Sequence, residues 1–272
     1  MNFPSVTLTL GIALIMLLIS TVGQAQSGGE TIIKPAEAVP KTPAEELMEK
    51  GDVFDLKFQA NRALNYYLRA AQLEPKNVPL LLRIARQYRY LMAEARTTED
   101  RLKFGATALG YGQRAAALAS RSSEAQLSPA ITYGKMLPYQ GSKAQVEATP
   151  HIKEAADKAI KLDPRNDNAW HVLGRWHQVL AGIGTLKRAL GGLIYGKLPV
   201  TTNEAAVVCF ERAIAINPHR LRHYIELGRT YAQMGKNVEA RLFLEKGLAM
   251  PDKEYDDPEL KAKGKEALAK IR

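Results

Sequence analysis

The chain has 272 residues, of which 38 are Lys or Arg and 28 are Asp or Glu, so its formal net charge is +10 at pH 7. Hydrophobic residues make up 46% and charged residues 24%, which are ordinary globular values and exclude wholesale disorder. The single cysteine, Cys209, excludes an intramolecular disulfide framework and a cysteine-rich zinc site. Because Cys209 lies in an apolar run, we expect it to be a small buried side chain.

The N-terminal region differs from the rest of the chain in composition. Residues 5–22 carry no charge and are followed by the small residues Gly23 and Ala25, which is typical of a signal peptide cleaved after Ala25. Such a protein would be exported, to a periplasm or out of the cell. Because about 20 apolar residues cross a bilayer, an uncleaved membrane anchor formed by residues 5–22 is the alternative. Residues 26–42 have several Gly and Pro and no apolar period, so they predict a flexible tether before a folded body at 43–272.

The body repeats one helical pattern. Each copy has Ala, an aromatic residue and Ala on one helix face, followed by a Pro that stops the helix. The residues are Ala63, Tyr67, Ala70 and Pro75 in one copy and Ala206, Phe210, Ala213 and Pro218 in another. With a matching first helix before each of them, this pattern resembles the tetratricopeptide repeats over about residues 44–250.

The spacing between the two helices of each repeat varies along the chain. Gly51 to Ala63 and Gly228 to Ala240 are both 12 residues apart, whereas the corresponding spacings in the middle three repeats are longer by 10 to 20 residues. We therefore expect an all-α, tetratricopeptide-like helical solenoid of about five helix pairs with insertions in the middle three. A last helix begins after Asp257, which we expect to cap it, and carries one apolar stripe, which indicates a C-terminal capping helix.

The fourth repeat carries a narrower resemblance. A Gly-x-Trp in its first helix, an apolar insertion closed by Gly and Pro, and a Thr-x-Glu start to its second helix are similar to the regulator-of-microtubule-dynamics family over about residues 44–272. The residues are Gly174, Trp176, Gly196, Pro199, Thr202 and Glu204. The resemblance implies a non-catalytic protein, and some family members associate with microtubules or mitochondria. Tubulin is an expected partner only if the body faces the cytoplasm.

Charge predicts a binding face. Repeat stacks bind ligands on the concave face formed by the first helices, and residues 78–135 contain nine Lys or Arg against four Asp or Glu. The repeat register places these partner-binding candidates on that face: Arg83, Arg86, Arg89, His171, Arg175, Gln178, Arg222 and Arg229. A basic groove would take an acidic protein partner or an anionic membrane surface. The alternative is a solvated basic face without a ligand.

The remaining patterns exclude other function classes or leave them open. No phosphate-binding glycine loop, nucleophile elbow or histidine metal site is present, so we expect no enzyme, no metal and no cofactor. Nucleic acid is not expected, because basic residues are not interleaved with stacking aromatics. An inserted helix at about 185–195 either packs across the groove or binds a membrane surface or partner. We expect a protein-interaction scaffold, with a microtubule-associated regulator and a membrane-peripheral structural protein as alternatives.

Overall fold

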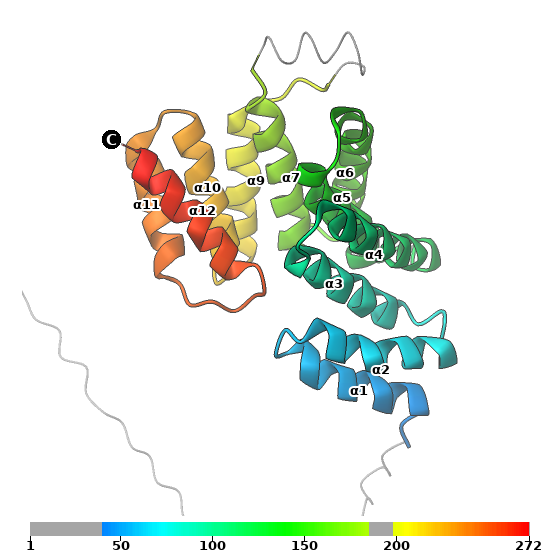
Figure 1. Ribbon diagram of the computed structural model, residues 1–272. Coiled ribbons are helices and arrows are strands. Elements are labelled where there is room, and N and C mark those ends of the chain that lie inside the picture. Colours follow the sequence, from blue (N-terminus) through cyan, green and yellow to red (C-terminus); the bar gives the residue numbers. More distant parts are fainter. Residues whose placement is uncertain (1–39, 185–197, 272) are drawn as a thin grey trace, which may run out of the picture. The chain divides into compact units, whose positions relative to one another are not determined.

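The computed structural model describes residues 40–184 and 198–271, and the chain divides into two compact units, residues 1–40 and 41–272. The second unit is described here. All regular elements among its described residues are helices: α1 (Pro43–Asp55), α2 (Ala60–Leu73), α3 (Val78–Glu94), α4 (Thr98–Leu118), α5 (Ser123–Met136), η1 (Leu137–Tyr139), α6 (Ser142–Leu162), α7 (Asp167–Ala181), α9 (Asn203–Ile216), α10 (Leu221–Gln233), α11 (Asn237–Ala249) and α12 (Asp257–Lys270) (Figure 1). Within these ranges, no helix combines the length and the apolar character that crossing a bilayer requires. The apolar run 5–22 lies outside them.

The described helices confirm the predicted repeat architecture. They form five pairs, α1 with α2, α3 with α4, α5 with α6, α7 with α9 and α10 with α11, and α12 follows. The outer pairs have helices of 13 or 14 residues, whereas α4 and α6 have 21 residues each. The insertions in the second and third pairs therefore lengthen helices. The insertion in the fourth pair includes 185–197, so the expected inserted helix falls outside the described residues.

Side-chain caps fix where most of these helices begin. Thr42 accepts the backbone N–H of Glu45, and the Glu45 carboxylate accepts the N–H of Thr42, so the first helix starts with a capping box. Similar caps satisfy the otherwise unpaired first-turn amides of five later helices. They are Asn77 on α3, Thr97 on α4, Ser122 on α5, Asn166 on α7 and Thr202 on α9.

The repeat positions form the core between paired helices. Tyr67 and Phe210 are fully buried, and so are the alanines that flank each of them at the predicted spacing. Cys209 is buried beside Phe210, as its apolar run predicts. The small residues allow close helix contact while each aromatic ring fills the space between two helices.

The last helix closes the stack. Its stripe, Leu260, Ala267, Leu268 and Ile271, packs against Leu221, Ile225, Ala240 and Leu244 of the fifth pair. The helix contacts both α10 and α11, and Figure 1 shows it lying across them. It therefore caps the apolar end of the repeat stack, as its pattern predicts, and it also covers part of the face formed by the first helices.

Candidate functional site

The first helices of the repeats line an open cavity, the first cavity. It has a volume of about 670 Å³ and is lined by residues of α1, α3, α5, α7 and α10 together with the loop between α11 and α12. A second cavity of about 470 Å³ lies between α7, α10 and α12. The eight predicted partner-binding residues divide between these places. Arg83, Arg86, Arg89 and Arg222 line the first cavity, Arg175, Gln178 and Arg229 line the second, and His171 lines neither.

Two predicted arginines of α3 pair with acids of α1. Arg83 Nε donates to Asp52 Oδ1 at 2.8 Å, and Arg86 forms an ion pair with Asp55. The buried Tyr67 hydroxyl donates to the same two carboxylates, and burial together with its bond to Asp52 raises the pKa of Tyr67. The positive charge on this wall of the first cavity is therefore partly neutralised by carboxylates of α1. The side chains of the Arg83–Asp52 pair stay about one-third exposed.

Arg89 is the deepest cation on the wall. Its side chain is buried, and Nη1 donates to the hydroxyls of Ser128 at 3.4 Å and Thr132 at 3.3 Å. Among the described residues no carboxylate forms an ion pair with it. Desolvation lowers its pKa to about 10, so the guanidinium still carries its charge at neutral pH.

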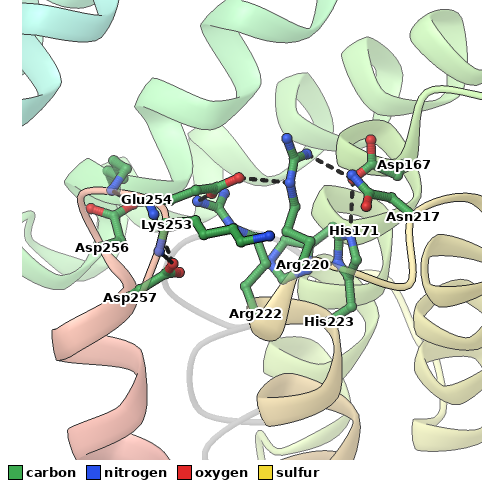
Figure 2. A network of polar contacts seen from close by, with 11 residues as sticks. Asp167, His171, Asn217, Arg220, Arg222, His223, Lys253, Glu254, Asp256 and Asp257 are labelled. Atoms are coloured by element: carbon green, nitrogen blue, oxygen red, sulfur yellow. Dashed lines mark hydrogen bonds and ion pairs between the residues drawn. The ribbon is translucent and has the colours of Figure 1, made fainter. Parts of the chain in front are cut away.

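The loop before α12 brings acids to the same wall (Figure 2). Glu254 accepts from Arg220 Nε at 2.7 Å and forms an ion pair with Arg222, while Asp256 pairs with Lys135 at 2.6 Å. Burial alone would raise the pKa of Asp256, but Lys135, Arg222 and Arg89 together outweigh burial and lower the pKa. Asp257, expected as the helix cap, is instead the first residue of α12, and it accepts the backbone N–H groups of Lys253 and Glu254.

His171 belongs to a polar network behind this wall. Asp167 Oδ2 accepts from Arg220 at 2.7 Å and from His223 Nε2 at 2.9 Å. Burial lowers the pKa of His223, so its ring is neutral at pH 7; with the proton on Nε2, its Nδ1 accepts from His171 Nδ1, 3.0 Å away. Desolvation, followed by the nearness of His223, lowers the pKa of His171 well below its ordinary value. Both rings are thus neutral at pH 7. His171 takes part in an internal hydrogen bond and does not line either cavity.

Two arginines that line the second cavity pair with a buried carboxylate. Glu226 is 2% exposed and accepts from Arg175 and Arg229, each at 2.7 Å. Burial alone would raise the pKa of Glu226, but the two arginines lower it. Gln178 is buried, accepts from Arg175 and donates to the Glu226 carbonyl at 3.2 Å. These contacts give Gln178 a structural part in this wall.

The motif residues of the fourth pair hold helices together. A Cβ on Gly174 would lie 2.9 Å from Phe210 Cε1, so only glycine lets α7 approach α9 this closely. Trp176 is buried and donates from Nε1 to the Thr149 carbonyl at 2.9 Å. Thr202 caps α9, and Glu204 lies in its first turn. Pro199 precedes that helix, and Gly196 lies outside the described residues.

Sequence reasoning missed the acidic half of the site. It identified the arginines, but not their carboxylate partners Asp52, Asp55, Glu226 and Glu254, nor the loop residues Tyr255 and Asp256. A register signal existed for two of them, because Asp52 and Asp55 have the same three-residue spacing as Arg83 and Arg86 on the next first helix. No local pattern marks the loop acids. In the part of the chain that the structure describes, no group of three His, Cys, Asp or Glu is arranged to hold a metal.

Comparisons with known proteins agree with this architecture. A family model described as regulator of microtubule dynamics protein 1-3 matches residues 47–272. The chain is 27% identical over 226 residues to regulator of microtubule dynamics protein 1 of Bos taurus, covering 82% of this chain and 71% of that protein. It is 27% identical over 255 residues to the protein of that name from Pongo abelii, covering 93% of this chain and 81% of that one.

A solved structure agrees with the fold. A thermophilic TPR protein of Thermus thermophilus superposes with a TM-score of 0.59, covering 83% of this chain and 99% of that one at 17% identity. At this identity the likeness concerns the fold. It supports the assignment of the five helix pairs as tetratricopeptide repeats.

Proposed function

The chain belongs to the regulator of microtubule dynamics protein 1-3 family, and on that premise we propose that it is a non-catalytic protein-interaction scaffold that binds an acidic partner in the first cavity. Family and fold both fit a scaffold, since tetratricopeptide-like stacks present their first helices to protein ligands. The observation that carries the finer proposal is the charge of the cavity wall. Seven Lys or Arg and five Asp or Glu line it.

The surplus of positive charge is placed where a ligand can use it. Arg89 is charged, lines the cavity and has no ion-pair partner among the described residues. The Arg83–Asp52 pair is about one-third exposed, and exposed pairs of this kind contribute little stability. A ligand carboxylate could therefore replace Asp52 as the partner of Arg83 at small cost.

A labelled acidic peptide tests this proposal. We would titrate fluorescein-labelled hexaglutamate with the full chain and follow fluorescence anisotropy, comparing wild type with Arg83→Gln. Loss of one charge-assisted hydrogen bond should weaken binding by about tenfold. The matched control is Arg212→Gln, on the exposed surface of α9. Equal affinities of wild type and Arg83→Gln, or no binding at all, would contradict an acidic ligand in this cavity.

A second candidate function is association with microtubules, which the family membership favours. The matching relatives carry the name regulator of microtubule dynamics protein 1. Cosedimentation of the chain with polymerised tubulin at moderate salt tests it. Recovery of the chain in the supernatant at all tubulin concentrations would reject it.

The N-terminal segment decides which partners the body can meet. We propose export with cleavage after Ala25, supported by the uncharged run 5–22 and the small residues that follow it. The intact mass of the protein purified from its own cells should then correspond to a chain that starts at Gln26. A full-length mass in the membrane fraction would support the anchor instead. Cytoplasmic exposure of that form would favour the microtubule function.

The third alternative, a membrane-peripheral protein, depends on residues 185–195, which lie outside the described residues. Flotation of the chain with anionic liposomes tests it. A chain that stays at the bottom of the gradient would reject this alternative.

A further inference from the structure

The loop between α11 and α12 occupies the wall of the first cavity. It runs from Met250 to Asp256 and places two carboxylates and one aromatic ring on three different helices. Glu254 binds the arginines of α10, Asp256 binds Lys135 of α5, and Tyr255 stacks on Tyr90 of α3. The segment that makes these contacts is Glu254-Tyr255-Asp256, an aromatic residue between two acids.

We propose that this loop is an internal copy of the ligand. The cavity would take a protein segment with an aromatic residue between two carboxylates, and the chain's own loop would compete with that segment. This inference rests on the proposed function and names the chemistry of its ligand.

The backbone of the loop and its side chains are held by different contacts. Asp257 Oδ2 accepts the backbone N–H of Lys253 at 2.8 Å and of Glu254 at 2.7 Å, which holds the turn before α12. The side chains of Glu254, Tyr255 and Asp256 point to other helices and are not needed to form that turn. They contact the wall as a bound peptide would.

The contacts of Tyr255 indicate which side chain suits the middle position of the segment Glu254-Tyr255-Asp256. Its ring centroid lies 4.2 Å from that of Tyr90 at an interplanar angle of 17°, and 5.9 Å from that of Phe58 in a T-shaped arrangement. Its hydroxyl donates to Glu94 at 3.1 Å. An amphipathic ring with one hydrogen-bonding end satisfies this position, so tyrosine fits better than phenylalanine.

The fit of the loop is incomplete. Among the described residues, Arg222 Nε and Asp256 Oδ1 are buried without a hydrogen-bond partner. Leaving buried polar atoms unpaired costs free energy. Arg89 lines the same cavity and has no ion-pair partner in the ranges 40–184 and 198–271. A separate segment free to adjust its backbone could satisfy Arg222 and Arg89, and so displace the loop.

The space in the cavity is sufficient for a short segment. With the loop in place the cavity still has about 670 Å³, within the range of natural ligand sites. An incoming segment could therefore make its first contacts at Arg83 and Arg89 before the loop leaves.

A loop variant tests the competition. The probe is a fluorescein-labelled peptide with the sequence of residues 252–257, Asp-Lys-Glu-Tyr-Asp-Asp, titrated with the full chain. The double variant Glu254→Gln/Asp256→Asn weakens the internal contacts and should bind the peptide at least about fivefold more tightly than wild type. The control Glu154→Gln/Asp157→Asn makes the same chemical change on α6 and should match wild type. A peptide with Asn and Gln in place of its acids should not bind.

A second variant and a second measurement guard against loss of folding. Tyr255→Ala removes the stacking on Tyr90 and the hydrogen bond to Glu94 but keeps both loop acids, and it should also tighten peptide binding. In wild type, added peptide should speed hydrogen exchange at the amides of Lys253 and Glu254, since release of the loop side chains from the cavity wall loosens the turn that Asp257 holds. Equal peptide affinity in wild type and both loop variants, with no change in exchange, would overturn the internal ligand.

The outcome also separates this inference from the proposed function. If Arg83→Gln weakens peptide binding while the loop variants bind like wild type, the cavity binds acidic segments and the internal-ligand inference fails. If no form binds either hexaglutamate or the loop peptide, both fail.

Discussion

Tyr255, in the loop before the last helix, stacks on Tyr90 of the third helix with ring centroids 4.2 Å apart. The two residues are 165 positions apart in the sequence. This contact ties the C-terminal end of the repeat stack to its second pair. On either side of Tyr255, Glu254 reaches two arginines of the first cavity and Asp256 reaches Lys135. The loop before α12 therefore forms part of the cavity wall.

Because Glu226 is buried and paired with two arginines, we expect its replacement to lower the free energy of unfolding strongly. Glu226→Ala leaves Arg175 and Arg229 facing each other without a counter-ion. Removing one partner of a buried pair is strongly destabilising, and because both arginines are partly exposed we expect a loss of about 2–3 kcal/mol. Urea unfolding measures it, and Glu154→Ala on the exposed face of α6 is the control. A loss below that of the control would contradict a structural role for the pair.

The His171–His223 pair predicts acid sensitivity. Both pKa values are lowered in the folded protein, so between pH 6.5 and the lowered values the unfolded chain binds protons that the folded chain does not. Stability should therefore fall as pH drops below about 6.5, with a slope of up to about 1.4 kcal/mol per pH unit for each histidine.

A histidine variant isolates that effect. His171→Gln should make the fall in melting temperature between pH 7.5 and pH 5 shallower. Parallel pH profiles for wild type and His171→Gln would show that the pair does not contribute.

Two helical glycines should respond to alanine in opposite directions. A Cβ on Gly228 of α10 would lie 2.8 Å from the backbone N of Leu244, which cannot move away easily. We expect Gly228→Ala to cost about 1–3 kcal/mol. A Cβ on Gly110 of α4 meets nothing within 4 Å, so Gly110→Ala should add about 0.5–1 kcal/mol through helix propensity. Thermal unfolding measures both, and equal shifts would contradict the close approach of α10 and α11.

Cys209 should be protected from thiol reagents. It is 4% exposed, and burial raises its pKa to about 11, so little thiolate forms at neutral pH. Modification by a disulfide reagent should be slow in buffer and fast in urea. Fast modification in buffer would show that the α7–α9 interface opens readily.

The fold could be predicted because its signals are local. The spacing of Ala63, Tyr67 and Ala70 depends on one helix face, and the same residues form the core between α1 and α2. The apolar stripe of the last helix likewise predicted its packing on the fifth pair. The expected cap at Asp257 was wrong, because this carboxylate turns back to the amides of the preceding loop.

The site could be predicted only in part because its signals are not local. Register on the first helices identified Arg83 and Arg86, but the ion pairs that partly neutralise them come from another helix. His171 and Gln178 fit the same register and are used within the protein instead. Nothing near Glu254 in the sequence indicates that it reaches Arg222, because that contact depends on how α12 folds back on α10.

Photo-crosslinking reports most directly whether an acidic segment binds in the first cavity. The probe is the peptide of residues 252–257 with benzoylphenylalanine in place of its tyrosine, irradiated with the full wild-type chain and mapped by mass spectrometry. We expect crosslinks at Phe58 and on α3 near Tyr90, reduced in Arg83→Gln and increased in Glu254→Gln/Asp256→Asn. Crosslinks on the second helices, such as α6 or α9, with none on α3, would contradict it.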